Sequence, residues 1–231
     1  MLEKRWAYAT VVFIVLALAG LGSAQEVEPA ALSEYRLSFD DLAPGTLPQN
    51  WSVDATDPSG KLAEWKVIVD GQAPSKPNVL SLTRTHDTSG GVFNLCRTNA
   101  ILFQDGSIEV GLRADTGKED QGGGVIWRAR DANNYYIARY NPLEDNFRIY
   151  YVKNGSRKQL ASAAPIGIPA GEWLKFKIVQ HGDKMEGYLN GKKYLEVSDN
   201  TFTGPGGVGF WTKADAASSF DDLRVLPASR D

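Results

Sequence analysis

Residues 122–152 show the clearest alternation of apolar and polar side chains, in the sequence GGGVIWRARDANNYYIARYNPLEDNFRIYYV. In its first part, the apolar residues Val125, Trp127 and Ala129 occupy every second position. Ile126, Arg128 and Arg130 occupy the positions between them. The polar run 131–134 and the Pro142-containing run 141–146 separate two further segments of this kind. Alternation with period two is typical of strands, so this segment predicts three antiparallel strands.

The lengths of the two connections predict which residues face each other. If 131–134 forms a four-residue loop, Arg130 lies opposite Tyr135 and Ile126 lies opposite Arg139; the second connection places Arg139 opposite Arg148. A slip of one residue would move every side chain to the other face. With this register one face is apolar, and the other collects Arg128, Arg130, Tyr135, Arg139, Arg148 and Tyr150.

The rest of the chain between 35 and 226 reads as further short strands, with no convincing helix. Asn154-Gly155 and Asn190-Gly191 stand between alternating runs, and Asn-Gly is a strong signal for a two-residue hairpin turn. The sequence therefore predicts an all-β protein, folded as a two-sheet antiparallel sandwich or a barrel.

The first 24 residues are typical of a secretory signal peptide, and their alanine-rich composition favours a bacterial one. An uncleaved membrane anchor is the alternative, but the apolar run over 7–21 is shorter than the roughly 20 residues that span a bilayer. We expect a signal peptide over 1–24, a flexible leader over 25–34, one domain over 35–227 and a tail over 228–231. The mature protein would be secreted or periplasmic, with no membrane insertion after cleavage.

Charge and cysteine content narrow the range of partners. The formal net charge of −3 makes the chain a poor candidate for binding nucleic acid. Cys96 is the only cysteine, so an intrachain disulfide is impossible, and its simplest role is that of a small buried hydrophobe. Pairing between chains is the alternative, but we expect a monomer.

The order of segments in the second half carries a resemblance. GEWLKFKI over 171–178 is followed by GYLNGKKYLEV over 187–197, and then by the glycine-led GGVGFWTK over 206–213. In this order the chain resembles the concanavalin A-like lectins and glucanases, including laminin-G domains. The resemblance implies a jelly roll of two antiparallel sheets.

Within that superfamily the chain is most similar to secreted bacterial domains of the 3-keto-disaccharide hydrolase type, loosely labelled family 16 glycoside hydrolases. The matching segments are WKVIVDG over 65–71, GGVIWR over 123–128 and NYY over 134–136. This resemblance implies a sugar-related ligand. It does not by itself imply catalysis, because the fold carries both lectins and enzymes.

Catalytic groups are hard to find in the sequence. A retaining glycosidase needs two carboxyl groups about 5 to 5.5 Å apart, and no predicted strand has a Glu-x-Asp-x-Glu pattern that would supply them. Asp120 and Glu144 are candidates within loops, where solvated turn residues are the plain alternative, and His86 is a third candidate beside Arg84 and Asp87. Neither histidine has a second His or Cys nearby, so a zinc site has little support.

A repeated motif raises the question of a metal. Phe39-Asp40-Asp41-Leu42 recurs as Phe220-Asp221-Asp222-Leu223. Terminal strands of a jelly roll commonly lie side by side, so Asp40 and Asp221 could meet on a structural Ca²⁺. The alternative is that these carboxylates cap turns. Apart from such an ion, no cofactor is expected, and Asp221 should be the more buried of its pair because it shares a side with Leu223 and Val225.

The arginine and tyrosine face remains the best functional candidate. Tyrosine offers a flat ring to sugar CH groups, and arginine offers forked donors to sugar oxygens or carboxylates. The alternative is a solvated face on which arginine stems cover the rings. We favour binding of a carbohydrate, because four guanidinium groups without a compensating Asp or Glu would repel each other unless an acidic or polyhydroxylated glycan relieved them. A glycosidic-bond hydrolase or lyase, and a non-catalytic envelope module that binds protein, stay open as alternatives.

Overall fold

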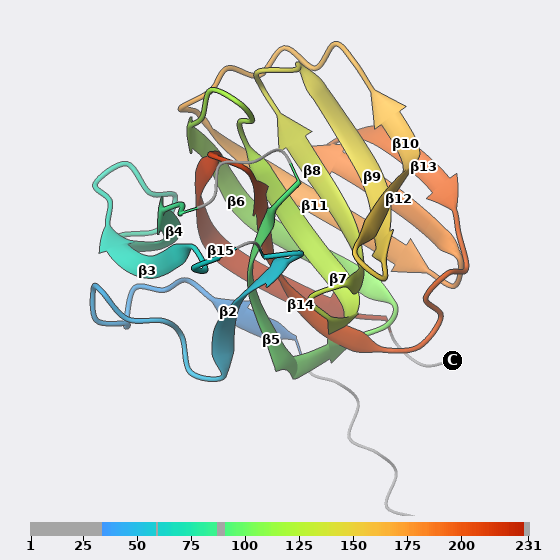
Figure 1. Cartoon of the computed structure of the whole chain (residues 1–231), viewed down its shortest axis with the longest axis horizontal. Helices are drawn as coiled ribbons and strands as arrows, with labels where there is room; N and C mark the ends of the chain where they lie inside the picture. Colours follow the sequence, from blue (N-terminus) through green and yellow to red (C-terminus); the bar gives the residue numbers. More distant parts are fainter. Residues whose placement is uncertain (1–33, 59, 87–90, 229–231) are drawn as a thin grey trace, which may run out of the picture. The chain divides into compact units, whose positions relative to one another are not determined.

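The computed structural model describes residues 34–58, 60–86 and 91–228, and its regular structure is entirely β (Figure 1). The predicted signal peptide, nearly all of the leader and residues 229–231 of the tail lie outside the described residues. No helix in the described part is long and apolar enough to cross a membrane. The strands are β1 (Tyr35–Leu37), β2 (Trp51–Thr56), β3 (Glu64–Val69), β4 (Asn78–Arg84), β5 (Phe93–Phe103), β6 (Gly106–Thr116), β7 (Gly123–Asp131), β8 (Asn134–Asn141), β9 (Asn146–Lys153), β10 (Ser156–Ala163), β11 (Trp173–His181), β12 (Lys184–Leu189), β13 (Lys192–Ser198), β14 (Gly206–Lys213) and β15 (Ala217–Pro227).

The strands form two antiparallel sheets that stack as two layers (Figure 1). The eight-stranded sheet has the order β13-β12-β11-β6-β15-β4-β3, with β1 paired to β15. The seven-stranded sheet has the order β10-β9-β8-β7-β14-β5-β2. The prediction of an all-β, two-sheet antiparallel sandwich is confirmed.

The main core lies between the sheets because every second residue of most strands points inward. Phe210 of β14 stacks on Phe220 of β15, with ring centroids 4.2 Å apart, and so joins one sheet to the other. Cys96 is fully buried in this core, as predicted, and burial raises the pKa of its thiol. Because the inner face of each sheet is packed, a ligand-binding site on a sheet must use its outer face.

The predicted hairpin turns are confirmed. Asn154 and Gly155 join β9 to β10, and Asn190 and Gly191 join β12 to β13. All four residues have positive φ values, between 50° and 81°. A two-residue hairpin turn of this hand needs positive φ at both positions, which explains the Asn-Gly sequence.

The predicted register is right on one side of β8 and wrong on the other. Arg139 lies opposite Arg148, as expected, but Ile126 lies opposite Ile137 and not opposite Arg139. The connection between β7 and β8 is a two-residue turn, with Asp131 opposite Asn134. A β-bulge interrupts the pairing of the two strands between Trp127 and Asp131. The Asp131 carboxylate accepts the Asn133 N–H at 2.7 Å and so closes the shorter turn.

The bulge turns Arg128 away from the outer face where it was predicted to lie. Arg128 has a φ of 46°, and its side chain is 1% exposed. Its guanidinium group donates to the carbonyls of Gln104, Phe202 and Gly182 at 2.7 to 2.9 Å, and to Asp105 Oδ1 at 3.1 Å. Arg128 therefore joins three connecting segments at one end of the sandwich, and its predicted place on the outer face is wrong.

Replacing Arg128 should destabilise the protein strongly. Arg128→Met keeps the apolar stem but leaves the buried carbonyls and Asp105 without their donor, so we expect a loss of about 3–5 kcal/mol in the free energy of unfolding. Urea denaturation measures it. The matched control is Arg36→Met, which removes an exposed arginine paired with Glu34 and should cost less than about 1 kcal/mol. Equal losses in the two variants would contradict this role for Arg128.

Candidate functional site

The seven-stranded sheet brings four of the six predicted ligand-binding residues to its outer face. Arg139 and Tyr135 come from β8, four residues apart, and Arg148 and Tyr150 come from β9, two residues apart. Arg139 lies directly opposite Arg148. Arg128 lies elsewhere, as described above. Arg130 is exposed, and its guanidinium group lies 5.1 Å from the ring centroid of Phe202, so it also stays apart from this group.

The two tyrosines are buried and do not form an open stacking surface. Tyr135 and Tyr150 belong to a second hydrophobic cluster on this outer face, together with Phe93, Leu95, Ile126, Ala129, Ile137, Val152 and Trp211. Thr56, at the end of β2, hydrogen-bonds the Tyr135 hydroxyl at 2.7 Å. Burial raises the pKa of Tyr135. The aromatic rings therefore form a floor beneath the arginines, and the predicted stacking of sugar on them is not available in this arrangement.

Arg157 of β10 is a member of the site that the sequence analysis missed. Its guanidinium group lies over the rings of Tyr150 and Phe93, 4.5 and 4.8 Å from their centroids. Burial lowers the pKa of Arg157, and the charge of Arg139 acts in the same direction. Extending the register through the Asn154-Gly155 hairpin would have found it, because a two-residue turn places Arg157 opposite Val152.

Glu144, in the turn between β8 and β9, supplies negative charge to this face. Its Oε2 atom accepts hydrogen bonds from Arg139 and Arg148, both at 3.0 Å, and from Asn146 at 2.9 Å. Burial opposes ionisation, but the hydrogen bonds from Asn146 and Arg139 lower the pKa of Glu144 to about 2. The expectation that no carboxylate compensates these arginines is wrong, because this one comes from a turn and not from a strand.

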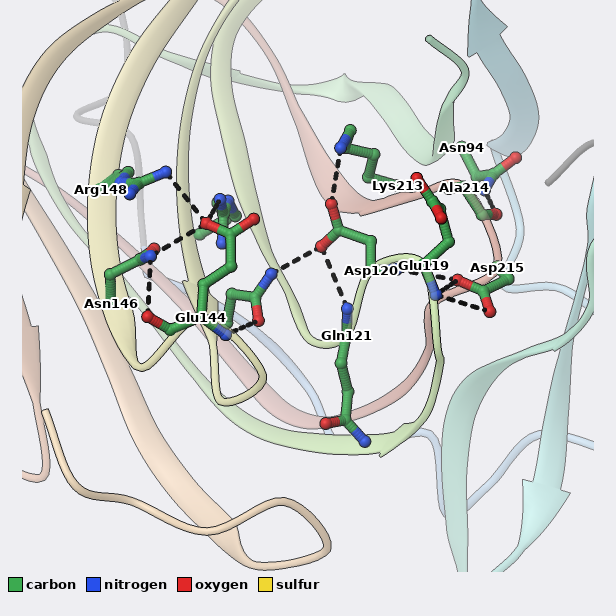
Figure 2. Close-up of polar contacts among 12 residues, drawn as sticks. Asn94, Glu119, Asp120, Gln121, Glu144, Asn146, Arg148, Lys213, Ala214 and Asp215 are labelled. Carbon is green, nitrogen blue, oxygen red and sulfur yellow. Dashed lines mark hydrogen bonds and ion pairs between the residues drawn. The ribbon is translucent and has the colours of Figure 1, made fainter. Parts of the chain in front are cut away.

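Asp120 lies in the same network, in the loop between β6 and β7. Figure 2 shows its carboxylate between Lys213 and the Gln121 backbone, close to Glu144. Lys213 Nζ lies 2.8 Å from Asp120 Oδ2, and the side-chain amide of Asn141 donates a hydrogen bond to Asp120 Oδ1 at 2.7 Å. The Oδ1 of Asn141 in turn accepts the Glu144 N–H at 2.9 Å. Asn141 thus connects two of the three catalytic candidates.

The loop that carries Asp120 is held by a second carboxylate. Asp215 accepts the backbone N–H groups of Lys118, Glu119 and Asp120 at 2.7 to 3.2 Å. Figure 2 shows Asp215 beside Glu119. These donors lower the pKa of Asp215 although its burial acts in the opposite direction. The position of Asp120 is therefore fixed by backbone contacts, whatever its own side chain binds.

The remaining candidates lie outside this network. His86 Nε2 is 3.4 Å from Glu64 Oε1 in the eight-stranded sheet, so the third catalytic candidate does not join Asp120 and Glu144. Its predicted catalytic role has no support from this arrangement.

Asp40 and Asp221 bind different donors. Asp40 accepts the Asn78 N–H at 3.0 Å and so holds the start of β4, whereas Asp221 accepts the Ser75 N–H at 2.8 Å and holds the β3–β4 connection. Asp221 is buried and Asp222 exposed, as predicted, and burial raises the pKa of Asp221 to about 6. Among the described residues, no group of three or more His, Cys, Asp or Glu could hold a metal. The structural Ca²⁺ stays a prediction, and the contacts follow the alternative of turn capping.

The guanidinium group of Arg139 is only partly satisfied. Its side chain is 2% exposed, yet Nε and Nη1 have no hydrogen-bond partner within the described chain. The Nη1 atom of Arg157 is also buried and has no hydrogen-bond partner within the described chain. Gly124 lies opposite Arg139, where a Cβ atom would fall 1.8 Å from the Ala138 carbonyl oxygen, so β7 presents no side chain there. A buried donor without a partner is costly, and these donors suit an electron-rich ligand.

The fold defines the class of protein: a jelly-roll sandwich of two antiparallel sheets. Three solved structures show the same fold. They are a carbohydrate-binding module from Bacillus subtilis (18% identity, 75% of this chain and 93% of that one, TM-score 0.58), a galectin-like protein of unknown function from the same organism (15%, 88% and 99%, 0.58) and a Bacillus licheniformis β-glucanase (11%, 84% and 98%, 0.56).

Residues 38–226 match the model of one protein family, so the chain belongs to the 3-keto-alpha-glucoside-1,2-lyase-like domain family. The predicted resemblance to 3-keto-disaccharide hydrolase-type domains is thereby confirmed. No curated protein matches the sequence.

The ion pairs of Glu144 predict a pH dependence of stability. A carboxyl group with a folded pKa of about 2 stabilises the fold above its unfolded pKa, near 4.3, and loses this contribution as the pH falls through 2. The side chain is 41% exposed, so water weakens the pairs, and we expect a contribution of about 1 kcal/mol. Urea unfolding at pH 5.5 and 2.5 should show a larger loss for the wild type than for Glu144→Gln.

A matched control for this measurement is Glu172→Gln, on an exposed turn before β11. This variant should retain the pH dependence of the wild type. If Glu144→Gln retains it too, the ion pairs with Arg139 and Arg148 do not stabilise the protein.

Proposed function

We propose that the protein binds an acidic or highly hydroxylated glycan at the outer face of the seven-stranded sheet, through Arg139, Arg148 and Arg157. The observation that carries this proposal is the buried Arg139 guanidinium group with two nitrogen atoms that have no partner in the described chain. Membership in a family named for a glucoside lyase supports a sugar-related ligand.

The charge distribution supports an anionic group on this glycan. Glu144 already engages one nitrogen of Arg139 and one of Arg148, but the described contacts leave Arg157 without a carboxylate partner. Arg139 and Arg157 lie close enough for the charge of one to lower the pKa of the other. A carboxylate or sulfate would offset this repulsion and accept paired hydrogen bonds in the fork of a guanidinium group.

The same contacts support binding without catalysis. A general acid or base works best with a pKa near the operating pH. The pKa of Glu144 is about 2, and three side chains already donate to one of its oxygens. Asp120 is 2% exposed and paired with Lys213. Neither carboxylate is free to move a proton in this arrangement.

A pair of matched ligands tests the binding proposal. Oligogalacturonate carries a carboxylate on each ring, and its methyl ester is neutral with the same ring structure. We expect the wild type to bind the acid in isothermal titration calorimetry and to bind the ester much more weakly. Arg148→Gln should weaken binding of the acid about tenfold, the loss of roughly 1.4 kcal/mol typical of one charged hydrogen bond.

Two further variants sharpen the test. Glu144→Gln removes the carboxylate that competes for Arg139 and Arg148, so it should bind oligogalacturonate at least as tightly as the wild type does. Arg36→Gln changes an exposed arginine of the other sheet and should leave binding unchanged. Sulfated oligosaccharides are the second ligand class to titrate. Absence of binding to both acidic classes would overturn the proposal.

The second candidate function is elimination across a glycosidic bond, which the family membership favours. In a 3-keto-α-glucoside the carbonyl at C3 acidifies the proton at C2. A base takes this proton, the electron pair forms an enolate, and the carbonyl re-forms as the C1–O bond breaks and the leaving oxygen gains a proton. Arg139 or Lys213 could stabilise the enolate oxygen. Glu144 is the more exposed of the two nearby carboxylates and would have to act as the base.

A chromogenic substrate separates the two functions. Elimination from p-nitrophenyl 3-keto-α-glucoside releases nitrophenolate, which is followed by absorbance. The binding proposal predicts no release above the uncatalysed rate. Release by the wild type that falls by about 10²- to 10⁴-fold in Glu144→Gln, the range for a lost acid or base, would instead establish catalytic cleavage, and an unsaturated sugar product would identify it as elimination.

Export of the protein remains a prediction. Export would place the site among extracellular glycans, but the predicted signal peptide lies outside the described residues.

Recognition of a protein partner is the third possibility. The exposed large hydrophobic residues come from separate segments of the chain, so they give this possibility no specific support: Leu62, Val69, Leu102, Leu143 and Leu226.

A further inference from the structure

The outer face of the eight-stranded sheet holds a cavity of about 780 Å³ that the proposed function does not use. Its walls come from β6, β11, the β3–β4 connection, the β12–β13 turn and β15. None of these lining residues belongs to the arginine network of the other sheet. A cavity of this size lies within the range of small-ligand sites, which are about 300–1,000 Å³.

Trp173 forms one apolar wall of this cavity. It is the one tryptophan among the described residues that is not buried. Its cross-strand neighbour Arg113 lies over the ring, 4.9 Å from the centroid, and is itself held by Asp70 and Asp115 at 2.7 and 2.5 Å. These contacts fix the indole plane before any ligand arrives.

Gly111 opens the space beside this ring. A Cβ atom at this position would lie 3.3 Å from both the Asp221 carbonyl oxygen and Pro74 Cγ, and 3.6 Å from Trp173 Cε3, so the two rings border a residue without a side chain. Gly111 pairs with Lys175 of β11, whose side chain lies on the same outer face and is exposed. The result is a narrow apolar slot with polar groups at its border.

The polar border is balanced in charge. Glu109 and Lys177 lie opposite each other and form an ion pair of 2.8 Å, and Lys175 and Asp222 add one charge of each sign. This balance differs from the guanidinium cluster on the other sheet. Mixed donors and acceptors without a net charge favour a neutral ligand rich in hydroxyl groups, and an indole ring favours one with an apolar ring face.

We propose that this cavity, the Trp173 groove, is a second glycan-binding site that takes a neutral oligosaccharide. One pyranose ring lies against Trp173 and Pro74, and its hydroxyl groups bind the side chains at the border, Lys175 and Asp222 among them. This proposal is independent of the proposed function, because it rests on the other sheet and on a different ligand charge. One molecule would then bind a neutral and an acidic glycan segment at once.

Tryptophan fluorescence tests this site directly. Cellohexaose, laminarihexaose and maltohexaose serve as neutral probes for the full mature protein. We expect at least one of them to shift the emission, because sugar would replace water beside Trp173. Trp173→Ala should lower the affinity for that probe at least tenfold in calorimetry. The circular dichroism spectrum of this variant should match that of the wild type, which separates a local effect from a loss of folding.

A second variant fills the groove and keeps the indole ring. Gly111→Val places methyl groups between Pro74 and Trp173, and should abolish binding of the neutral probe while circular dichroism shows an intact fold. Arg148→Gln should bind the neutral probe as tightly as the wild type does. Failure of all three probes to bind would overturn the second site, as would binding that neither Trp173→Ala nor Gly111→Val weakens. Self-association of the wild type that both variants remove, without sugar binding, would make the groove a protein interface.

Discussion

The burial of positive charge on an outer sheet face is the constraint on which the candidate site depends. Arg139 and Arg157 lie on a floor of aromatic and aliphatic side chains, where water cannot solvate them fully. Charge in such a place is stable only with partners. Glu144, in the turn between β8 and β9, accepts a hydrogen bond from Arg139. Asn141 links that turn to Asp120 through two hydrogen bonds. The turn between β8 and β9 thus supplies a carboxylate to the strand arginines, and the neutralisation is incomplete.

This arrangement also sets the protonation of the Glu144 carboxylate. The contacts that lower the pKa of Glu144 make it a good partner for guanidinium groups and a poor proton carrier near neutral pH. Asp120 is committed to Lys213 and to two further donors. Family membership points to glucoside chemistry, whereas the pairing of these carboxylates favours recognition. A sandwich of this kind supports either function, and the difference lies in a few side chains.

The two outer faces of the sandwich present different side chains over the same inner architecture. Each sheet turns one face to the shared core. The seven-stranded sheet presents arginines over a hydrophobic floor, and the eight-stranded sheet presents a tryptophan beside a glycine with balanced charges around them. Strand alternation makes this possible, because residues that face outward can change without disturbing those that face inward.

The sequence by itself determined the local features of this protein. Alternation with period two and the Asn-Gly turns predicted the strands, the hairpins and the pairing of Arg139 with Arg148, because these depend on neighbouring residues. Only the tertiary structure decided the rest. The bulge after Trp127 moved Arg128 from the outer face into a buried set of carbonyl contacts. Glu144 and Arg157 joined the site through a turn and a fourth strand. Side chains from turns follow no period, so the partners of a buried charge became visible only once the chain had folded around it.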